Sequence, residues 1–431
     1  MGEEMIRELM EFLENSPTAF HAVENFKRIL LKEGYQELRE TRHWEILPEG
    51  RYFVVRNGSS IVAFQVGCSR KNYRFKVMAS HSDFPAFKVK EQAELSLQDA
   101  YTKLNTEGYG GMLCATWMDR PLSVAGRAVI REKDGFRTRL VNIDRDLLLI
   151  PSVAIHMNRN ANDGYAYNKQ IDMLPLLGEK AGKEGLLKQM VAEKLHTKPE
   201  QIYGMDLYLY NRMKPAVWGR DREFLSSPRL DDLECAYASF RGFLEAQDEE
   251  AVNVFACFDN EEVGSHTLQG AGSTFLADVL CRINEGLSLS KESYYRGVAA
   301  GFMVSCDNAH AVHPNHPEKT DTNNCVYMNR GIVVKSHAGQ QYTSDGFSIA
   351  VWKELCEKAG VPLQYFSNRS DMRGGSTLGN IAMSHVPLHA VDIGLAQLAM
   401  HSAYETAGVR DGRYLAQAAK TFYNSTCRWN D

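Results

Sequence analysis

Three strand-like runs that each stop at a functional side chain constrain the fold of this chain more than any other feature. Residues 74–80, 252–258 and 301–306 are rich in apolar, β-branched and aromatic side chains, which is typical of strands buried within a sheet. Open α/β sheets build their sites at the edge where such strands end. The runs therefore predict an α/β fold with its functional groups gathered at one edge of the sheet.

The residues at the ends of these runs carry metal-binding and acid–base chemistry. His81 follows the first run, Glu261 and Glu262 lie just beyond the second, and Asp307 follows the third. Adjacent residues leave a turn in different directions, so one glutamate can bind a metal while the other faces a water molecule. Zinc takes imidazole nitrogen and carboxylate oxygen, and catalytic sites keep one position open for water.

Two further candidates lie at or near predicted helices. Asp231 and Asp232 follow residues 227–230, and His401 lies within residues 397–402. Two histidines and three carboxylates suit a pair of ions about 3.5 to 4 Å apart that share one carboxylate. Such a pair lowers the pKa of a bridging water and stabilises the oxyanion formed when that water attacks a carbonyl. The remaining glutamate can pass the water's proton to a leaving amine, which is the chemistry of amide hydrolysis.

Five segments resemble the motifs of the aspartyl aminopeptidase family of di-zinc exopeptidases, in the family's order and nearly from end to end. They are residues 81–85, 227–232, 258–265, 307–315 and 400–402. The resemblance implies a mixed-sheet α/β/α peptidase domain with an inserted β-rich dimerisation domain. It also implies two zinc ions per subunit, with manganese or cobalt as alternatives. Peptides with a free amino terminus would be the substrates, and dimers would assemble into a dodecamer.

The resemblance assigns five metal ligands. Asp231 would bridge the two ions, His81 and Asp307 would complete one site, and Glu262 and His401 would complete the other. Because all five are matched together with the neighbouring glutamate, a purely structural role for the set is disfavoured.

Four further roles follow from the same resemblance. Glu261 would be the general base, and Asp83 would orient the ligating imidazole, since such a partner fixes the tautomer and raises ligand basicity. His156 would reach a neighbouring subunit's active site and support the tetrahedral intermediate. Lys335 would contact the acidic side chain of the substrate. Without the resemblance, a histidine after an apolar stretch and a lysine at a strand end are ordinarily packed or solvated groups.

The histidine-rich segment and two departures from the family pattern bear on the substrate pocket. His310, His313 and His316 have the spacing of a metal cluster, but the prolines among them favour a loop. We assign His310 and His313 to the substrate pocket or its support rather than to the metals. Phe84 and residues 371–377 differ from the family pattern, so the preference for an amino-terminal Asp or Glu is less secure than the di-metal chemistry.

Composition adds limits on domains, partners and compartment. A chain of 431 residues exceeds the usual single core, so more than one domain is expected. The net charge of −5 gives no indication of nucleic acid or an anionic membrane as partner. Nine cysteines without a Cys-x-x-Cys motif are typical of reduced thiols. An acidic amino terminus and the lack of a membrane-length apolar run favour a cytoplasmic protein.

A change in the sequence pattern, from helical segments to strand-like stretches, predicts the domain boundaries. We expect a catalytic domain from residues 1–91 and 222–431, interrupted by an inserted domain at 92–221. The amino-terminal part shows two helical patterns and an Asn-Gly hairpin signal at residues 57 and 58. Within the insertion, strand-like stretches include residues 122–130 and 147–150, and residues 179–193 read as a helix.

Three functions remain open from the sequence. A cytosolic di-zinc aminopeptidase that removes an amino-terminal acidic residue is the leading hypothesis. A related di-metal aminopeptidase or deacylase with broader preference is the nearest alternative, and a catalytically idle oligomeric scaffold or cargo protein is an alternative of another class. A scaffold has no need of Glu261 beside a full ligand set. The sequence contains no His-Glu-x-x-His or Gly-x-Ser-x-Gly motif, which disfavours other hydrolase classes.

Overall fold

The protein is described by a computed structural model that covers residues 2–98, 100–179 and 185–426. Within these residues the chain forms two compact units. The first comprises the described residues within 2–83, 215–400 and 405–426, and the second comprises those within 84–214 and 401–404. The main segment of the second unit runs from residue 84 to residue 214, where the sequence suggested 92 and 221. Its function in dimerisation stays a prediction.

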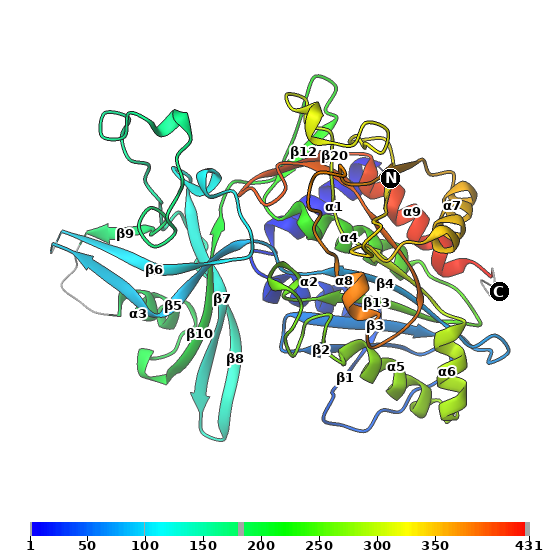
Figure 1. The fold of residues 1–431 in the computed structure, drawn as a ribbon. Coiled ribbons are helices and arrows are strands. Elements are labelled where there is room, and N and C mark those ends of the chain that lie inside the picture. The colour runs from blue at the N-terminus through cyan, green and yellow to red at the C-terminus, as the bar shows by residue number, and fades with distance from the viewer. Residues whose placement is uncertain (1, 99, 180–184, 427–431) are drawn as a thin grey trace. The chain divides into compact units, whose positions relative to one another are not determined.

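A mixed nine-stranded sheet forms the centre of the first unit among the described residues (Figure 1). Its central strands β13, β4, β14 and β18 run parallel, whereas β3 and β16 run antiparallel to their neighbours β13 and β18. The three strand-like runs of the sequence are β4, β13 and β14, and they are adjacent in this sheet. In spatial order the strands are β1 (Gln36–Leu38), β2 (Arg51–Arg56), β3 (Ser60–Val66), β13 (Val252–Phe258), β4 (Phe75–His81), β14 (Phe302–Cys306), β18 (His389–Gly394), β16 (Ile332–Lys335) and β17 (Leu363–Phe366).

The hairpin between β2 and β3 forms where the Asn-Gly pair predicts it. Asn57 and Gly58 have φ angles of 53° and 73°, in the left-handed region that Asn and Gly adopt most readily in tight turns. The flanking strands pair from Arg56 with Ser60 through Arg51 with Gln65.

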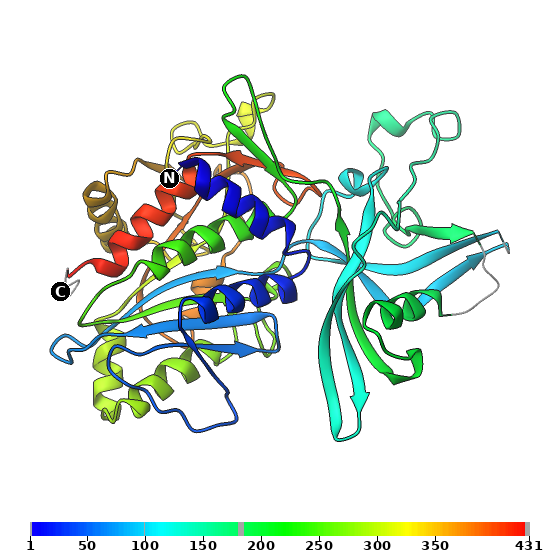
Figure 2. The ribbon, with the colours of Figure 1, turned by 180° about the vertical axis from the view of Figure 1, so that it is seen from behind.

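Helices cover both faces of the sheet, which confirms the mixed α/β class. One layer packs its aromatic side chains on the strands: the ring of Phe26 lies 4.8 Å from Phe240 and 5.3 Å from Phe255. In Figure 2 this layer lies in front of the strands. It consists of α1 (Gly2–Glu14), α2 (Ala19–Lys32), α4 (Leu230–Leu244) and α9 (Asp411–Asn424), with α7 (Gly346–Ala359) packed beside α9.

The opposite face is covered by shorter helices, and its core includes the Phe258 and Phe275 rings, 6.4 Å apart. These helices are α5 (Phe275–Gly286), α6 (Lys291–Ala299) and α8 (Leu378–Ala382). The short 3-10 helices within the described residues are η1 (Cys114–Trp117), η2 (Ala161–Asp163), η3 (Pro199–Gln201), η4 (Glu261–Val263) and η5 (Pro317–Lys319). Across the described residues, no helix has the length and apolar character needed to cross a membrane.

The first unit also contains a smaller five-stranded sheet, and its strand β12 directly precedes α4 in the chain. Its described strands, in spatial order, are β11 (Ala216–Trp218), β12 (Phe224–Ser227), β20 (Glu405–Gly408), β19 (Ala396–Leu398) and β15 (Ala309–His310). Asp231 lies at the start of α4, as expected. The expectation of a helix around His401 is wrong: residues 396–398 form β19, which pairs with β15 and β20, and His401 lies in the turn that follows.

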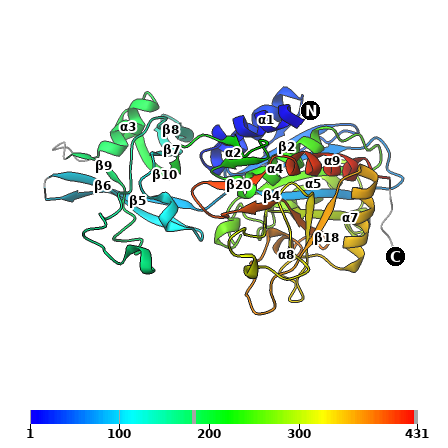
Figure 3. The same cartoon turned by 90° about the horizontal axis from the view of Figure 1, so that it is seen from above.

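The second unit is β-rich, as expected for the inserted segment. Figure 3 shows α3 beside the strands, and Leu187, Val191 and Ala192 of this helix enter the unit's core. The described elements are, in sheet order, β8 (Gly135–Asn142), β7 (Leu122–Glu132), β10 (Ile202–Asn211), β5 (Ala86–Leu97), β6 (Tyr101–Tyr109) and β9 (Leu176–Glu179), with α3 at Leu186–Lys194.

Two local expectations for the second unit need correction. The helix expected from residue 179 begins at Leu186, since Glu179 ends β9, and residues 180–184 lie outside the described residues. The stretch at 147–150 forms isolated bridges rather than a strand, with Leu148 bridged to Leu122 and Leu149 to Leu176.

Candidate metal centre

Parallel pairing brings the functional residues to one edge of the nine-stranded sheet. His81 is opposite Phe258 in the register of β4 and β13, so the turn after Phe258 begins beside the imidazole. On the other side of β4, Cys306 ends β14, and Asp307 follows it directly. Because the three strands are parallel and adjacent, their carboxyl ends lie together.

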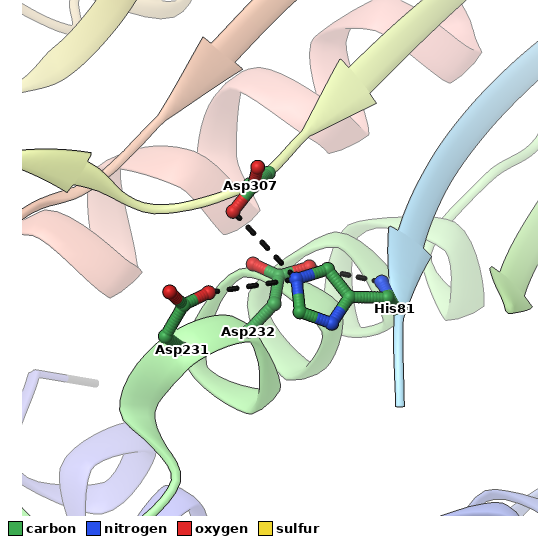
Figure 4. A group of neighbouring side chains, drawn as sticks. All are labelled: His81, Asp231, Asp232 and Asp307. Atoms are coloured by element: carbon green, nitrogen blue, oxygen red, sulfur yellow. Dashed lines mark hydrogen bonds and ion pairs between the residues drawn. The ribbon is translucent and has the colours of Figure 1, made fainter. Parts of the chain in front are cut away.

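His81 lies among carboxylates from two other segments, the start of α4 and the residue after β14 (Figure 4). Its Nε2 lies 3.5 Å from Asp231 Oδ1 and 3.7 Å from Asp307 Oδ1, and its backbone N–H donates to Asp232 Oδ2 at 3.0 Å. One potential ligand atom from each of these four residues lies within 4.8 Å of the others. All but Asp307 are buried.

The turn after β13 brings a second acidic group to the same imidazole. Potential ligand atoms of His81, Glu261 and Glu262 also lie within 4.8 Å of one another. The two glutamates open the 3-10 helix η4, which follows Asn260 in the left-handed region with φ of 66°. Both side chains are partly exposed, whereas Asp231 and Asp232 are buried.

The buried charges of this cluster are out of balance. Burial alone would lower the pKa of His81, but the carboxylates of Asp232, Asp231, Asp307 and Asp83 outweigh it and hold that pKa well above its usual value. Burial raises the pKa of Asp232 well above its ordinary range, and burial does the same for Glu261. Negative groups out of water and close together favour a bound cation.

The donor set fits a divalent metal of borderline softness. Imidazole nitrogen and carboxylate oxygen are ligands that zinc accepts. Asp232 Oδ1 is buried without a hydrogen-bond partner among the described residues, so this pocket holds an acceptor that the protein itself leaves unsatisfied. Both observations are those expected of residues arranged around a cation.

Asp83 ties the histidine to the glutamate turn. Its carbonyl oxygen lies 3.0 Å from His81 Nδ1, so Nδ1 donates and Nε2 is left to face the other carboxylates. Its two carboxylate oxygens accept the backbone N–H groups of Glu261 and Glu262, each at 3.1 Å. One buried residue therefore positions the imidazole through its backbone carbonyl and both glutamates through its side chain.

The backbone around Asp231 departs from helical geometry. Asp231 has φ and ψ of −80° and 111°, and its peptide bond to Asp232 is cis. Glu405, on β20, accepts the backbone N–H groups of Leu230 and Asp231 through Oε2, at 2.7 and 3.1 Å. Sequence reasoning missed Glu405. The two ends of the contact are separated by 175 positions, so no local pattern could have indicated it.

Lys335 lies behind Asp307 and is only 2% exposed. Its ammonium donates to the carbonyl oxygens of Asp307 and Asn308 at 2.9 and 3.3 Å, and it lies 3.5 Å from Asp307 Oδ2. Burial would lower the pKa of Lys335, but the carboxylates of Asp307 and Asp392 raise it above its usual value. The lysine therefore stays charged and in contact with a proposed ligand.

The remaining predicted residues are His156, His401, His310 and His313. His156 occupies an exposed turn of the second unit. His401 also belongs to the second unit, where its carbonyl oxygen accepts the backbone N–H of Leu113 at 3.1 Å. His310 is exposed at the end of β15, and His313 is exposed in the loop beyond it, where its Nδ1 accepts the N–H of Asn315.

A mixed sheet between helix layers, with imidazole and carboxylate groups gathered where its parallel strands end, defines a metal-dependent hydrolase. The sequence model of the aminopeptidase I zinc metalloproteases (M18) matches residues 12–423. A probable M18 family aminopeptidase 2 of Clostridium acetobutylicum is 45% identical over 429 residues, which cover 98% of this chain and 99% of that protein. This chain belongs to the M18 family and is a zinc-dependent aminopeptidase.

Solved structures show the same fold over nearly the whole chain. A chain in the cryo-electron microscopy structure of the Ape4 and Nbr1 complex superimposes with a TM-score of 0.94 at 34% identity, covering 98% of this chain and 86% of that one. The S. cerevisiae mApe1 dodecamer gives a TM-score of 0.83 at 25% identity, with 98% of both chains covered. The fold class and the resemblance identified in the sequence are thereby confirmed.

Proposed function

We propose that this aminopeptidase removes an amino-terminal Asp or Glu from peptides, with Glu261 as the general base. The observation that carries the proposal is the placement of Glu261 beside Glu262 on one short turn, with both backbone N–H groups bound to Asp83. The turn gives the two neighbouring carboxylates separate tasks. One can bind metal while the other accepts a proton.

Two zinc ions per subunit would be held by the five matched residues, with manganese or cobalt as alternatives. When bound, they would supply Lewis-acid polarisation of the scissile carbonyl and make a water molecule more acidic. Asp231 would be shared between the ions, and the ligands are His81, Asp231, Glu262, Asp307 and His401. The grouping of His81, Asp231 and Asp307 supports one of these sites, and the role of His401 rests on the family resemblance.

Glu261 would move one proton through the reaction. Its carboxylate accepts a proton from the attacking water and then delivers it to the amine nitrogen that leaves. His81 stays in place because Asp83 binds Nδ1 through its carbonyl oxygen. Asp83 thus holds both the imidazole and the base in position while the proton moves.

Selection of an acidic first residue would depend on a buried positive charge near the reacting centre. Lys335 supplies that charge, although its ammonium already contacts Asp307 and Asn308. A substrate carboxylate would be a further acceptor for it. His310 and His313 would line the same pocket. A broader preference for neutral first residues is the alternative.

We further propose that the protein works as a homo-oligomer in which His156 completes a neighbouring site. The S. cerevisiae relative is a dodecamer. The segment around His156 also exposes large apolar side chains: Val153 and Ile155 are each 50% exposed, Met157 82% and Ile171 71%. Such a concentration of exposed apolar surface is typical of an interface. Location in the cytoplasm stays a prediction.

One activity panel tests the substrate proposal. The enzyme is assayed on Asp-, Glu-, Ala- and Leu-anilides with added zinc, manganese or cobalt. Acidic anilides should be cleaved best. A higher kcat/KM for Leu would contradict the acidic preference. An N-acetylated Asp-anilide serves as the control, because an aminopeptidase needs the free amine and a deacylase does not.

Mixing inactive subunits tests the role of His156. Glu261→Gln and His156→Phe chains are purified separately, dissociated, mixed and reassembled. Partial activity should return, because some interfaces then combine an intact base with an intact histidine. The shared site would be ruled out if no activity returned after verified mixing. It would also be ruled out if the fully active wild-type protein were a monomer by analytical sedimentation.

A further inference from the structure

Glu405 is a buried carboxylate that touches the start of α4. It is 2% exposed and lies opposite Ser227 in the pairing of β20 with β12. A single oxygen, Oε2, accepts two successive backbone N–H groups, those of Leu230 and Asp231. Its partners are therefore fixed backbone atoms on the segment that carries the proposed bridging ligand.

The start of α4 has no capping side chain of its own. The first N–H groups of a helix have no partner within the helix, and a Ser, Thr, Asp or Asn at the N-cap ordinarily accepts one of them. Here the N-cap is Arg229, in the left-handed region with φ of 66°, and its side chain makes no capping hydrogen bond. Glu405 supplies the missing acceptor from a distant strand.

The hydrogen bond from the Asp231 N–H to Glu405 lies where the backbone of α4 departs from helical geometry. Asp231 and Asp232 both have non-helical φ and ψ angles, so the hydrogen bonds of the helix do not determine the direction of the Asp231 side chain. A carboxylate bound to the N–H of Asp231 and to that of the preceding residue restricts rotation of this segment. Hydrogen bonds to charged acceptors are the stronger kind, which suits this task.

We propose that Glu405 is a positioning residue for the metal centre, which sets the orientation of Asp231 through its backbone. The proposal rests on the proposed function of Asp231 as a metal ligand. Partners that orient a ligand without touching the metal typically change metal affinity by about 10- to 100-fold when they are removed. Loss of the Glu405 acceptor should therefore weaken metal binding without abolishing the fold.

Asp411 provides a matched control elsewhere in the same unit. It is 1% exposed, lies at the start of α9, and likewise accepts two backbone N–H groups, from Asn329 and Gly331. Neither of these partners is a proposed ligand. Replacement of Asp411 should therefore report the general cost of removing a buried carboxylate, separate from any effect on metal.

The test measures metal binding to the metal-free full-length protein. Wild type, Glu405→Met, Glu405→Gln, Asp411→Leu and Asp411→Asn are titrated with Co²⁺ in competition with a chelator, and the Co²⁺ absorption spectrum is recorded. Glu405→Met should bind Co²⁺ about 10- to 100-fold more weakly and with an altered spectrum. Glu405→Gln keeps an acceptor oxygen and should restore most of the affinity. The Asp411 variants should lose thermal stability but keep the wild-type affinity and spectrum.

The outcomes separate this proposal from the metal assignment itself. Wild-type affinity and spectrum in Glu405→Met would overturn the positioning role. If that variant does not fold, Glu405→Asp decides in the same way, because it keeps the charge but withdraws the acceptor from the two N–H groups. Asp231→Ala is titrated in parallel: unchanged binding there would overturn the proposed ligand, whatever Glu405 does. Equal losses in the Glu405 and Asp411 variants would show a general folding effect and likewise overturn the proposal.

Discussion

The two ends of strand β4 carry buried charges that are arranged in opposite ways. At its start, Lys76 is fully buried, pairs with Asp248, and donates to the carbonyl oxygens of Tyr423 and Ser425 at 2.8 and 2.5 Å. At its end, His81 is buried among several carboxylates. The first cluster matches its charges internally, whereas the second gathers negative charge around one imidazole.

This difference separates a structural cluster from a functional one. Burial alone would raise the pKa of Asp248, but Lys76 outweighs it and lowers the pKa below its usual value. Burial instead raises the pKa of Asp232 at the other end of the strand, where its neighbours are mostly acidic. Protein groups stabilise the charges at the start of β4. The acidic groups at its end are the arrangement expected of residues that hold a cation.

The largest expected effect is on catalysis at the carboxyl end of β4. Glu261→Gln should lower kcat by about 10²- to 10⁴-fold, because that is the usual contribution of a general base. Metal content and folding stability should stay at wild-type values, measured by elemental analysis and urea unfolding. The neighbouring substitution Glu262→Gln is the control and should lower metal content. Near-normal turnover of Glu261→Gln with full metal would refute the assignment.

The next largest effect is on the free energy of unfolding, through the Lys76 cluster at the start of β4. Lys76→Met removes the nearer cation and leaves the buried Asp248 carboxylate with only Arg74, whose Nη2 lies 3.8 Å from Oδ2. The free energy of unfolding should therefore fall by up to about 3 to 5 kcal/mol. Metal affinity of the folded protein should not change. Lys420→Met is the matched control, because the Lys420–Glu245 pair is half exposed, with side-chain exposures of 50% and 51%. Its loss should cost less than about 1 kcal/mol. Similar losses in the two variants, measured by urea unfolding, would contradict the comparison.

The sequence predicted the parts of the centre that depend on local patterns. Apolar runs and turn signals gave β4, β13 and β14, and the parallel order of these strands explains why His81, Glu261 and Asp307 come together. The ligand roles came from motif resemblance, since spacing alone does not distinguish a bridging carboxylate from a terminal one. The expectation of a helix at or near residues 397–402 was wrong, because pairing of β19 with two neighbouring strands outweighed local preference.

Contacts between distant segments could not be predicted. Glu405 and Asp231 meet only because β20 pairs with β12 next to the start of α4. Lys76 looked like an ordinary strand residue, and its burial depends on carbonyl groups 347 and 349 positions away. Such contacts are determined by the packing of the whole unit, which no short window of sequence contains.

Removal of the metal should destabilise the wild-type protein through the site at the carboxyl end of β4, and not through the Lys76 cluster at its start. A cation that binds only the folded state stabilises it by about 2.7 kcal/mol when its free concentration is 100 times its Kd. Addition of zinc to the metal-free enzyme should therefore raise Tm, and a chelator should reverse the rise. Asp231→Ala should show little response, whereas Lys76→Met, although less stable, should respond like wild type. An equal rise of Tm with zinc in the Asp231→Ala protein would contradict a stabilising metal site at the carboxyl end of β4.

The smallest effect is a pH dependence at the start of β4. Because the pKa of Asp248 is lowered in the folded protein, its contribution to stability is fully present above the pKa of the unfolded chain, near 3.9. The contribution is lost as pH falls through the lower, folded value. Urea unfolding of wild type and Asp248→Asn should therefore differ most between pH 5 and pH 7, and the difference should shrink below about pH 4. A difference that stays constant down to pH 3 would show that Asp248 stabilises the protein by its shape and hydrogen bonds rather than by its charge.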